Sequence, residues 1–146
     1  MRKLLGLMVV LAISTVVVSE DKKPSLDGTY VIVAIEKNGE KLPDESLRKT
    51  PEEDRTFTIK GDKLIRMGKN KEPIELKIDA SKTPAEIDMK ETKGDKPELS
   101  YGIYKLEGDT LTICGVEDSK PEDRPKEFKT SKDSKALLLI MKKKDK

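Results

Sequence analysis

The chain has 146 residues, 40% of them charged, with no histidine and a single cysteine. This length suits one domain and a targeting segment, but not two domains. The lack of histidine removes Ser-His-Asp triads, histidine general bases and most zinc sites, and one cysteine cannot form an intramolecular disulfide. We therefore expect one small domain that is not an enzyme and holds no metal or cofactor.

Residues 1–19 have the pattern of a cleavable export signal. Two basic residues precede an apolar run over Leu4–Val18, which has the length of a signal-peptide core and is short for a bilayer span. Val17 and Ser19 are small enough for the −3 and −1 positions of a processing site. We expect cleavage near Ser19, export to the periplasm or beyond the cell, and a single domain over residues 20–146. An uncleaved N-terminal anchor is the alternative.

Removal of the signal changes the charge balance. The full chain carries 30 basic and 28 acidic side chains. Because Arg2 and Lys3 leave with the signal, the mature chain has 28 of each sign. Interspersed charges that balance give no general attraction for nucleic acid. We expect no nucleic-acid partner, and no stable membrane insertion once the signal has been cleaved.

From Leu26 onward the chain reads as short β segments separated by turn residues. Tyr30–Ile35 is a run of mostly β-branched residues, and it is followed by Asn38-Gly39, a pair that tolerates positive φ. Pro43–Arg48 is the one plausible helix, because proline suits a first helical turn and acidic residues favour its N-terminal end. Pro51 ends it.

Two later segments are built alike. Residues 56–65 and 103–113 each contain a strand, a Gly-Asp turn and a second strand, which predicts two hairpins in a meander. Between them, Ile74–Asp79 and Ile87–Lys90 show the two-residue period of strands with one solvated face. After a polar loop over Glu117–Lys126, we expect Phe128 to begin a short strand and Ala136–Met141 to form a final strong one.

The first and last strands decide the architecture, because both are apolar on both faces. Such a strand is a poor open edge, since its unpaired backbone invites aggregation. Pairing the first strand with the last would remove both edges. We expect an all-β fold: a small antiparallel up-and-down β-barrel, lipocalin-like, with about eight strands and one short helix. In the alternative, both strands lie centrally in an open sheet or under the helix.

Several motifs carry a resemblance to a known family. Leu26–Tyr30, Asn38–Pro43, Gly102–Cys114 and Arg124–Phe128 follow one another as in a domain family that is found mainly in exported proteins of planctomycete bacteria. The family has no established activity, and its pattern resembles the calycin superfamily. There a tryptophan closes one barrel end, where this chain has Tyr30. The resemblance implies that Arg124 packs across Tyr30 in a cation–π contact at that end, with a ligand-facing role for Arg124 as the alternative.

Calycin barrels often hold small hydrophobic molecules, so the resemblance also implies a ligand in the barrel interior. Tyr101 and Ile103 share one face of their strand, and Tyr104 and Leu106 share the other. The candidate ligand-binding residues are Tyr30, Phe57, Leu76, Ile78, Met89, Tyr101, Ile103 and Tyr104. The alternative is that those facing inward are ordinary core, and that a filled barrel contacts a protein or the cell envelope through its surface.

Cys114 lies within an apolar run, which is typical of a small buried residue. A reactive thiol or an intermolecular bridge is the alternative.

Overall fold

The computed structural model describes residues 25–68 and 72–144, and the predicted signal segment lies outside these ranges. The described residues form strands, one α-helix and two 3-10 turns. The elements are β1 (Gly28–Lys37), β2 (Glu40–Lys41), α1 (Asp44–Lys49), η1 (Glu52–Arg55), β3 (Thr56–Lys60), β4 (Lys63–Arg66), β5 (Ile74–Asp79), β6 (Ala85–Lys93), β7 (Lys96–Glu107), β8 (Thr110–Val116), η2 (Pro121–Asp123) and β9 (Ala136–Lys143).

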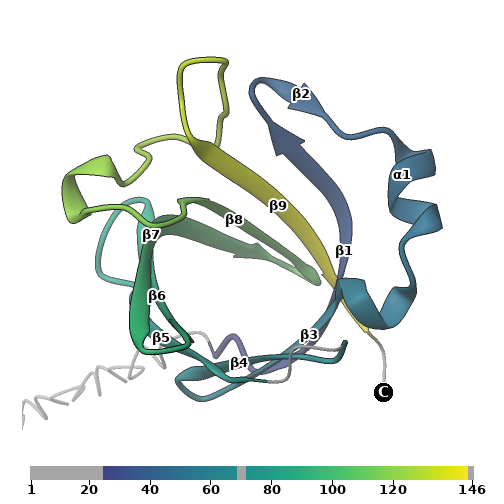
Figure 1. The fold of residues 1–146 in the computed structure, drawn as a ribbon, viewed down its shortest axis with the longest axis horizontal. Coiled ribbons are helices and arrows are strands. Elements are labelled where there is room, and N and C mark those ends of the chain that lie inside the picture. Colours follow the sequence, from purple (N-terminus) through teal and green to yellow (C-terminus); the bar gives the residue numbers. More distant parts are fainter. Residues whose placement is uncertain (1–24, 69–71, 145–146) are drawn as a thin grey trace, which may run out of the picture.

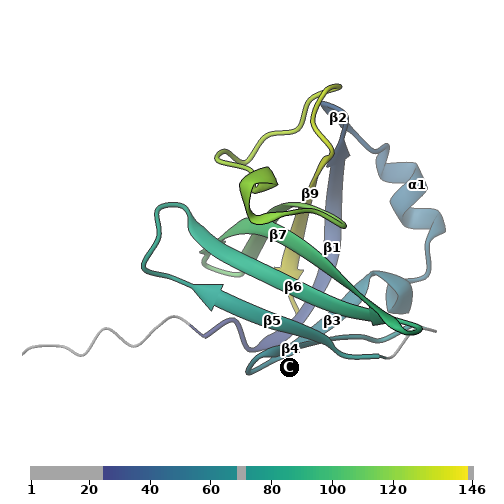
Figure 2. The same cartoon turned by 60° about the vertical axis from the view of Figure 1, so that its left-hand side comes forward.

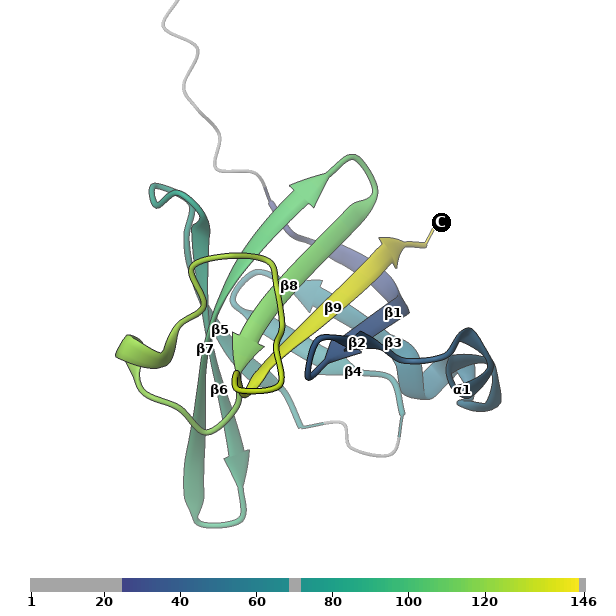
Figure 3. The ribbon, with the colours of Figure 1, turned by 90° about the horizontal axis from the view of Figure 1, so that it is seen from above.

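Eight of these strands form a closed ring. β1 pairs with β3, each strand from β3 to β9 pairs with the next, and β9 returns to pair with β1, always antiparallel. Figure 1 shows this ring, and Figure 3 shows β9 lying between β8 and β1. The predicted all-β up-and-down barrel, closed by the first and last strands, is confirmed. The two-residue strand β2 adds only to the end of β1.

The predicted turns connect these strands tightly. Lys60 pairs with Lys63 across the first Gly-Asp turn, and Glu107 pairs with Thr110 across the second. Asn38 and Gly39 have φ of 57° and 79°, which is the positive-φ geometry of a two-residue turn between strands. The prediction for Phe128 is wrong, because this residue lies in the loop between η2 and β9 and belongs to no strand.

The barrel has two different ends. The β3–β4 and β7–β8 turns lie at one end, which we call the closed end, and Leu26 packs into the core beside it. The other end, which we call the mouth, carries the β6–β7 turn and the loop over residues 117–135 that connects β8 to β9. The short helix α1 follows β2 and precedes β3 at the mouth, and lies outside the ring beside β1 (Figure 1).

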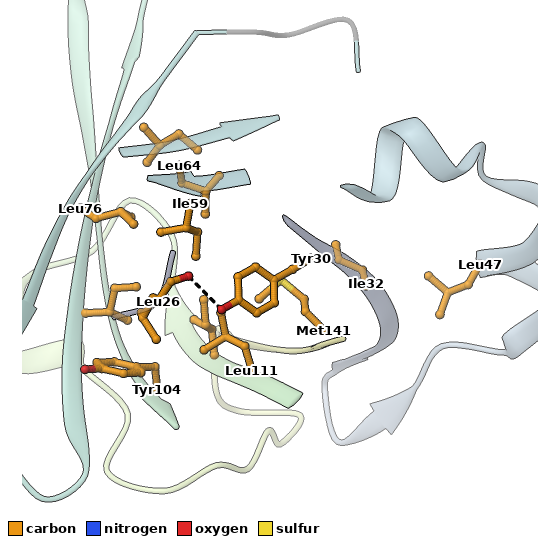
Figure 4. Close-up of a cluster of buried hydrophobic side chains, with 13 residues drawn as sticks. Leu26, Tyr30, Ile32, Leu47, Ile59, Leu64, Leu76, Tyr104, Leu111 and Met141 are labelled. Atoms are coloured by element: carbon orange, nitrogen blue, oxygen red, sulfur yellow. Dashed lines mark hydrogen bonds between the residues drawn. The ribbon is translucent and has the colours of Figure 1, made fainter. Parts of the chain in front are cut away.

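The closed end is filled by the core. Tyr30, Ile59, Ile87, Leu111 and Met141 are all at most 2% exposed and belong to one apolar cluster. The Tyr30 hydroxyl donates a hydrogen bond of 2.8 Å to the Leu26 carbonyl, drawn as a dashed line in Figure 4. This bond satisfies a buried polar group, and it fixes the chain that enters the first strand.

A bulge in β1 explains why this strand is apolar on both sides. Ile32 pairs with Met141 but Ala34 pairs with Ile140, so Val33 has no partner in β9 and the two faces exchange at this point. The outer side is partly covered, since Leu47 of α1 is buried against the core cluster. The Arg55 guanidinium, at the end of η1, also donates to the Ile32 carbonyl at 3.1 Å.

A second apolar cluster lies on the outer face of β7, β8 and β9. It contains Ile103, Cys114, Val116, Ala136 and Leu138, with Phe128 packed against it. The loop that carries η2 runs beside the mouth ends of these strands (Figure 2). The structure therefore has apolar packing on both sides of this part of the barrel wall.

Candidate functional site

The mouth half of the barrel contains a cavity of about 110 Å³. Its walls come from β3 to β9, and most of the lining side chains are apolar. The apolar lining residues are Phe57, Leu64, Ile74, Met89, Ile113, Val116, Leu137, Leu139 and Met141. Because the closed half is filled and the mouth half is not, the barrel combines a solid base with an open upper chamber.

Two glycines leave room in the wall of this chamber. Gly102 of β7 pairs with Gly115 of β8, and both positions face inward in register with Ile87 and Leu137. The backbones approach so closely here that a Cβ at Gly102 would lie 2.7 Å from the Cys114 carbonyl oxygen. No side chain therefore projects into the barrel from either position, and Gly115 itself lines the cavity.

Charged side chains surround the cavity at the mouth. Arg66, Glu91, Glu98 and Glu117 line it together with Ser100. The Arg66 guanidinium holds both Glu91 carboxylate oxygens, at 2.8 and 3.4 Å. β4 and β5 pair only at Lys63–Glu75 and Leu64–Ile74, so this ion pair joins β4 to β6 beyond the start of β5. The Arg66–Glu91 ion pair therefore bridges the edge of the barrel mouth where β4 and β5 share the fewest backbone pairs.

The predicted interior residues divide between the cavity and the base. Phe57 and Met89 line the cavity. Tyr30, Leu76 and Tyr104 belong to the buried core cluster, and Ile78 packs against that cluster. None of these four lines the cavity, so they support it from below.

Tyr101 and Ile103, which were expected in the interior, lie on the outer face of β7. Ile103 belongs to the outer cluster with Cys114. Tyr101 pairs with Asp88, and its ring lies under the Arg124 guanidinium at 5.3 Å from the ring centroid. Strand β7 alternates strictly here, so the inward position of Tyr104 requires the outward position of its neighbour.

The structure also corrects the expected partner of Arg124. The ring beneath its guanidinium is Tyr101, whereas the cation nearest the Tyr30 ring is Lys143, at 6.0 Å from the centroid. Arg124 donates to the Gly102 carbonyl at 2.7 Å and to the Asp88 carboxylate at 2.6 Å. Its side chain is 15% exposed. Arg124 therefore fastens the β8–β9 loop to the outside of β6 and β7.

Burial shifts three titratable groups toward their neutral forms. Desolvation raises the pKa of Tyr30, and the negative charge of Asp27 adds to the effect. Desolvation likewise raises the pKa of Tyr104, helped by Asp79. The Tyr104 hydroxyl is the one buried side-chain polar atom without a hydrogen-bond partner in the described chain, and Figure 4 shows it pointing away from Tyr30.

Cys114 is fully buried, which confirms the prediction of a small buried residue, and its thiol is free. Burial raises the pKa of this thiol, and Sγ donates a long hydrogen bond of 3.8 Å to the Lys129 carbonyl. A thiol held neutral under a loop is poorly suited to nucleophilic chemistry.

Within residues 25–68 and 72–144, no three His, Cys, Asp or Glu side chains are grouped to hold a metal ion. In the same ranges, no helix has the length and apolar character to cross a membrane.

Sequence reasoning missed the charged rim of the cavity. The signal was present, because Glu91 continues the inward series Ile87 and Met89 with the same two-residue spacing. Glu117 likewise continues the inward positions of β8 beyond Ile113 and Gly115, although its strand ends one residue earlier. The sequence alone places Glu117 only at the start of the polar loop over Glu117–Lys126.

Comparison with models of protein families, with curated proteins and with solved structures gave no match. The family resemblance noted in the sequence is thus not confirmed. The geometry itself establishes an antiparallel up-and-down barrel of eight strands, with a filled base and an apolar chamber at its mouth.

Proposed function

We propose that this domain is an exported, non-catalytic binding module that takes a small apolar molecule into the chamber at the barrel mouth. The observation that carries the proposal is the apolar cavity of about 110 Å³. An eight-stranded barrel is near the size at which side chains fill the interior or leave room for one small ligand. Here the base is filled and the mouth half keeps that room.

The volume restricts the size of the ligand. An enclosed apolar cavity of about 150 Å³ holds benzene, whereas pockets for drug-sized molecules measure about 300–1,000 Å³. The chamber of about 110 Å³ opens at the mouth, so a ring-sized group fits with its substituent outside. The proposed ligand therefore buries a body of at most about six heavy atoms, and long-chain lipids are too large.

The resemblance to exported planctomycete domains and to calycin barrels supports this proposal by analogy of fold alone. Export rests on the N-terminal pattern of the sequence, with cleavage near Ser19. The non-catalytic assignment rests on the lack of histidine in the chain and on the buried, neutral Cys114.

A pair of single-tryptophan variants tests the proposal, because the chain has no tryptophan and only two phenylalanines. Phe57 lines the cavity, while Phe128 lies outside the barrel against the outer cluster. In Phe57→Trp, benzyl alcohol should shift the emission in a saturable titration. In the matched Phe128→Trp control it should not. Because benzyl alcohol has eight heavy atoms, we expect a dissociation constant of about 1 mM, which corresponds to a binding free energy of about −4 kcal/mol.

Filling the chamber should abolish the response. Ser100 faces the cavity, and its hydroxyl makes no hydrogen bond to any of the described residues, so Ser100→Leu in the Phe57→Trp background should block the ligand. Thr92 lies on the outer face of β6 at the same end, so Thr92→Leu is the matched control. A Phe57→Trp signal that stays flat up to saturating benzyl alcohol would remove the basis for the proposal.

A surface role is the second candidate, and one feature favours it. The loop between β8 and β9 forms a wide hollow lined by side chains of both charges, including Asp118, Asp123, Lys126 and Lys135. If this surface binds a protein, Lys126→Glu should abolish co-purification of the partner and leave the urea midpoint unchanged. A lowered midpoint would mark the loop as structural instead.

A further inference from the structure

The chamber has a charged collar whose members come from four strands. The two-residue period of each strand carries the inward face up to the mouth, where polar residues replace apolar ones. Arg66 ends β4, Glu91 lies near the end of β6, Glu98 lies near the start of β7, and Glu117 directly follows β8. All four line the cavity at the end of the barrel that we call the mouth.

Lys93 lies beside these four residues and completes the collar, and both of its basic groups, Arg66 and Lys93, are already paired. Arg66 is held by Glu91 through two hydrogen bonds. The Lys93 ammonium, which follows Glu91 on the inner face, lies 2.9 Å from Glu98 and 3.8 Å from Glu91. The hydrogen bond that Lys93 donates to Glu98 raises the pKa of Lys93, so this cation stays charged. Neither base is free to receive an anionic ligand.

Glu117 has no such partner. It is exposed, and within residues 25–68 and 72–144 no basic group lies within ion-pair distance of its carboxylate. The negative charge of Glu117 also helps to raise the pKa of Lys93, so Glu117 lies close enough to act on the same group of charges. The collar formed by Arg66, Glu91, Lys93, Glu98 and Glu117 therefore carries three negative charges and two positive ones, and the surplus carboxylate borders the apolar chamber.

From this geometry we propose that the ligand is a small organic cation: a primary amine on a ring-sized apolar body, with the body in the chamber and the ammonium at Glu117. This inference rests on the proposed function, which supplies the chamber. An apolar group alone would gain nothing from the surplus charge, and a carboxylate or phosphate would be repelled by it. Glu117 is the specificity-determining residue, with Glu98 as the second carboxylate within the collar.

The expected selectivity is modest because the collar is partly open to water. Exposed ion pairs change an equilibrium by about 1.5- to 5-fold, and salt screens them. In Phe57→Trp at low ionic strength, benzylamine should bind about threefold or more tightly than benzyl alcohol, which has the same ring and the same number of heavy atoms. Benzoate should bind more weakly than either. The advantage of benzylamine should shrink at about 0.5 M salt.

One charge-removing substitution and its matched control make the test specific. Glu117→Gln in the Phe57→Trp background should give benzylamine and benzyl alcohol equal affinity, and it should leave benzyl alcohol binding unchanged. Glu107→Gln removes the same charge at the closed end, where Glu107 pairs only with exposed Lys105, and it should keep the preference.

The outcomes separate the two proposals. Equal affinity for the amine and the alcohol in the Phe57→Trp protein would overturn the cation inference and leave the binding chamber intact. A preference for benzylamine that survives Glu117→Gln would also overturn it, since the selectivity would then arise elsewhere. If none of the three compounds changes the Phe57→Trp emission while the protein is folded, the binding function fails and the cation inference fails with it.

Discussion

Replacement of Arg124 by alanine should be one of the most destabilising changes on the outer surface of this barrel. The guanidinium makes short bonds to the Gly102 carbonyl and the Asp88 carboxylate, lies 3.7 Å from Glu86, and covers the Tyr101 ring. Removal leaves two carboxylates without their cation and frees the loop that runs beside the outer apolar cluster.

The magnitude follows from these contacts. A hydrogen bond to a charged group contributes about 1.5–3 kcal/mol, and an exposed cation–π contact adds about 0.5–1 kcal/mol. Asp88 is 28% exposed, so its bond belongs at the low end of that range. We expect Arg124→Ala to lower the free energy of unfolding by about 2–4 kcal/mol, or the melting temperature by about 8–15 °C.

The assay is urea unfolding followed by far-ultraviolet circular dichroism, with Lys126→Ala as the control from the same loop. A double-mutant cycle identifies the partner ring. Arg124→Ala and Tyr101→Ala should couple by about 0.5–1 kcal/mol, whereas Arg124→Ala and Tyr30→Phe should add within about 0.5 kcal/mol. An Arg124→Ala cost no larger than that of Lys126→Ala, or coupling to Tyr30 instead of Tyr101, would refute the reasoning.

Three further predictions concern the buried groups and the glycine pair. Because Cys114 is buried and burial raises its pKa, Ellman's reagent at pH 8 should react at least about 100-fold more slowly with the native protein than in urea, and equal rates would mean that the loop does not protect it. The pKa of Tyr30 is raised in the folded state, so the unfolded state loses its proton first as pH rises. The free energy of unfolding should therefore fall above about pH 10, and it should fall less in Tyr30→Phe. At pH 7, Tyr30→Phe should itself lower the free energy of unfolding by about 1–2 kcal/mol, because it removes the hydrogen bond to Leu26. Urea midpoints at pH 7 and above pH 10 test both expectations. In the same assay, Gly102→Ala should lower the free energy of unfolding by about 1–3 kcal/mol. Gly115→Ala should lower it less, because the added Cβ would lie 3.3 Å from its nearest atom. The reverse order would contradict the close approach at Gly102.

Much of the barrel follows from local chemistry that the sequence displays. The boundaries of β3 and β5 match the predicted segments, because alternation and turn residues agree there. The pairing of β1 with β9 could be inferred from their two apolar faces, since such strands must be covered. The length of β7 could not be predicted, because the first half of this strand is polar on both sides of Leu99 and shows no clear apolar face.

The candidate site was harder to predict, because it depends on which face of each strand turns inward. Periodicity separates Tyr101 from Tyr104, but it does not say which of the two enters the barrel. The partner of Arg124 depends on the path of the β8–β9 loop, which has no repeating pattern to indicate it. The exchange of faces at Val33 has the same origin, since one bulged residue moves every later side chain of the strand to the opposite face.

The pairing of β1 with β9 also constrains how the chain reaches this structure. Tyr30 and Lys143 are direct neighbours in the sheet although 113 positions separate them in the sequence. Contacts of such long range must close a large loop before they contribute stability, which slows folding to about milliseconds or seconds. The ring cannot shut until residues 136–143 have been synthesised. Until then β1 keeps one edge unpaired, which is the interval in which the protein is most vulnerable to association with other chains.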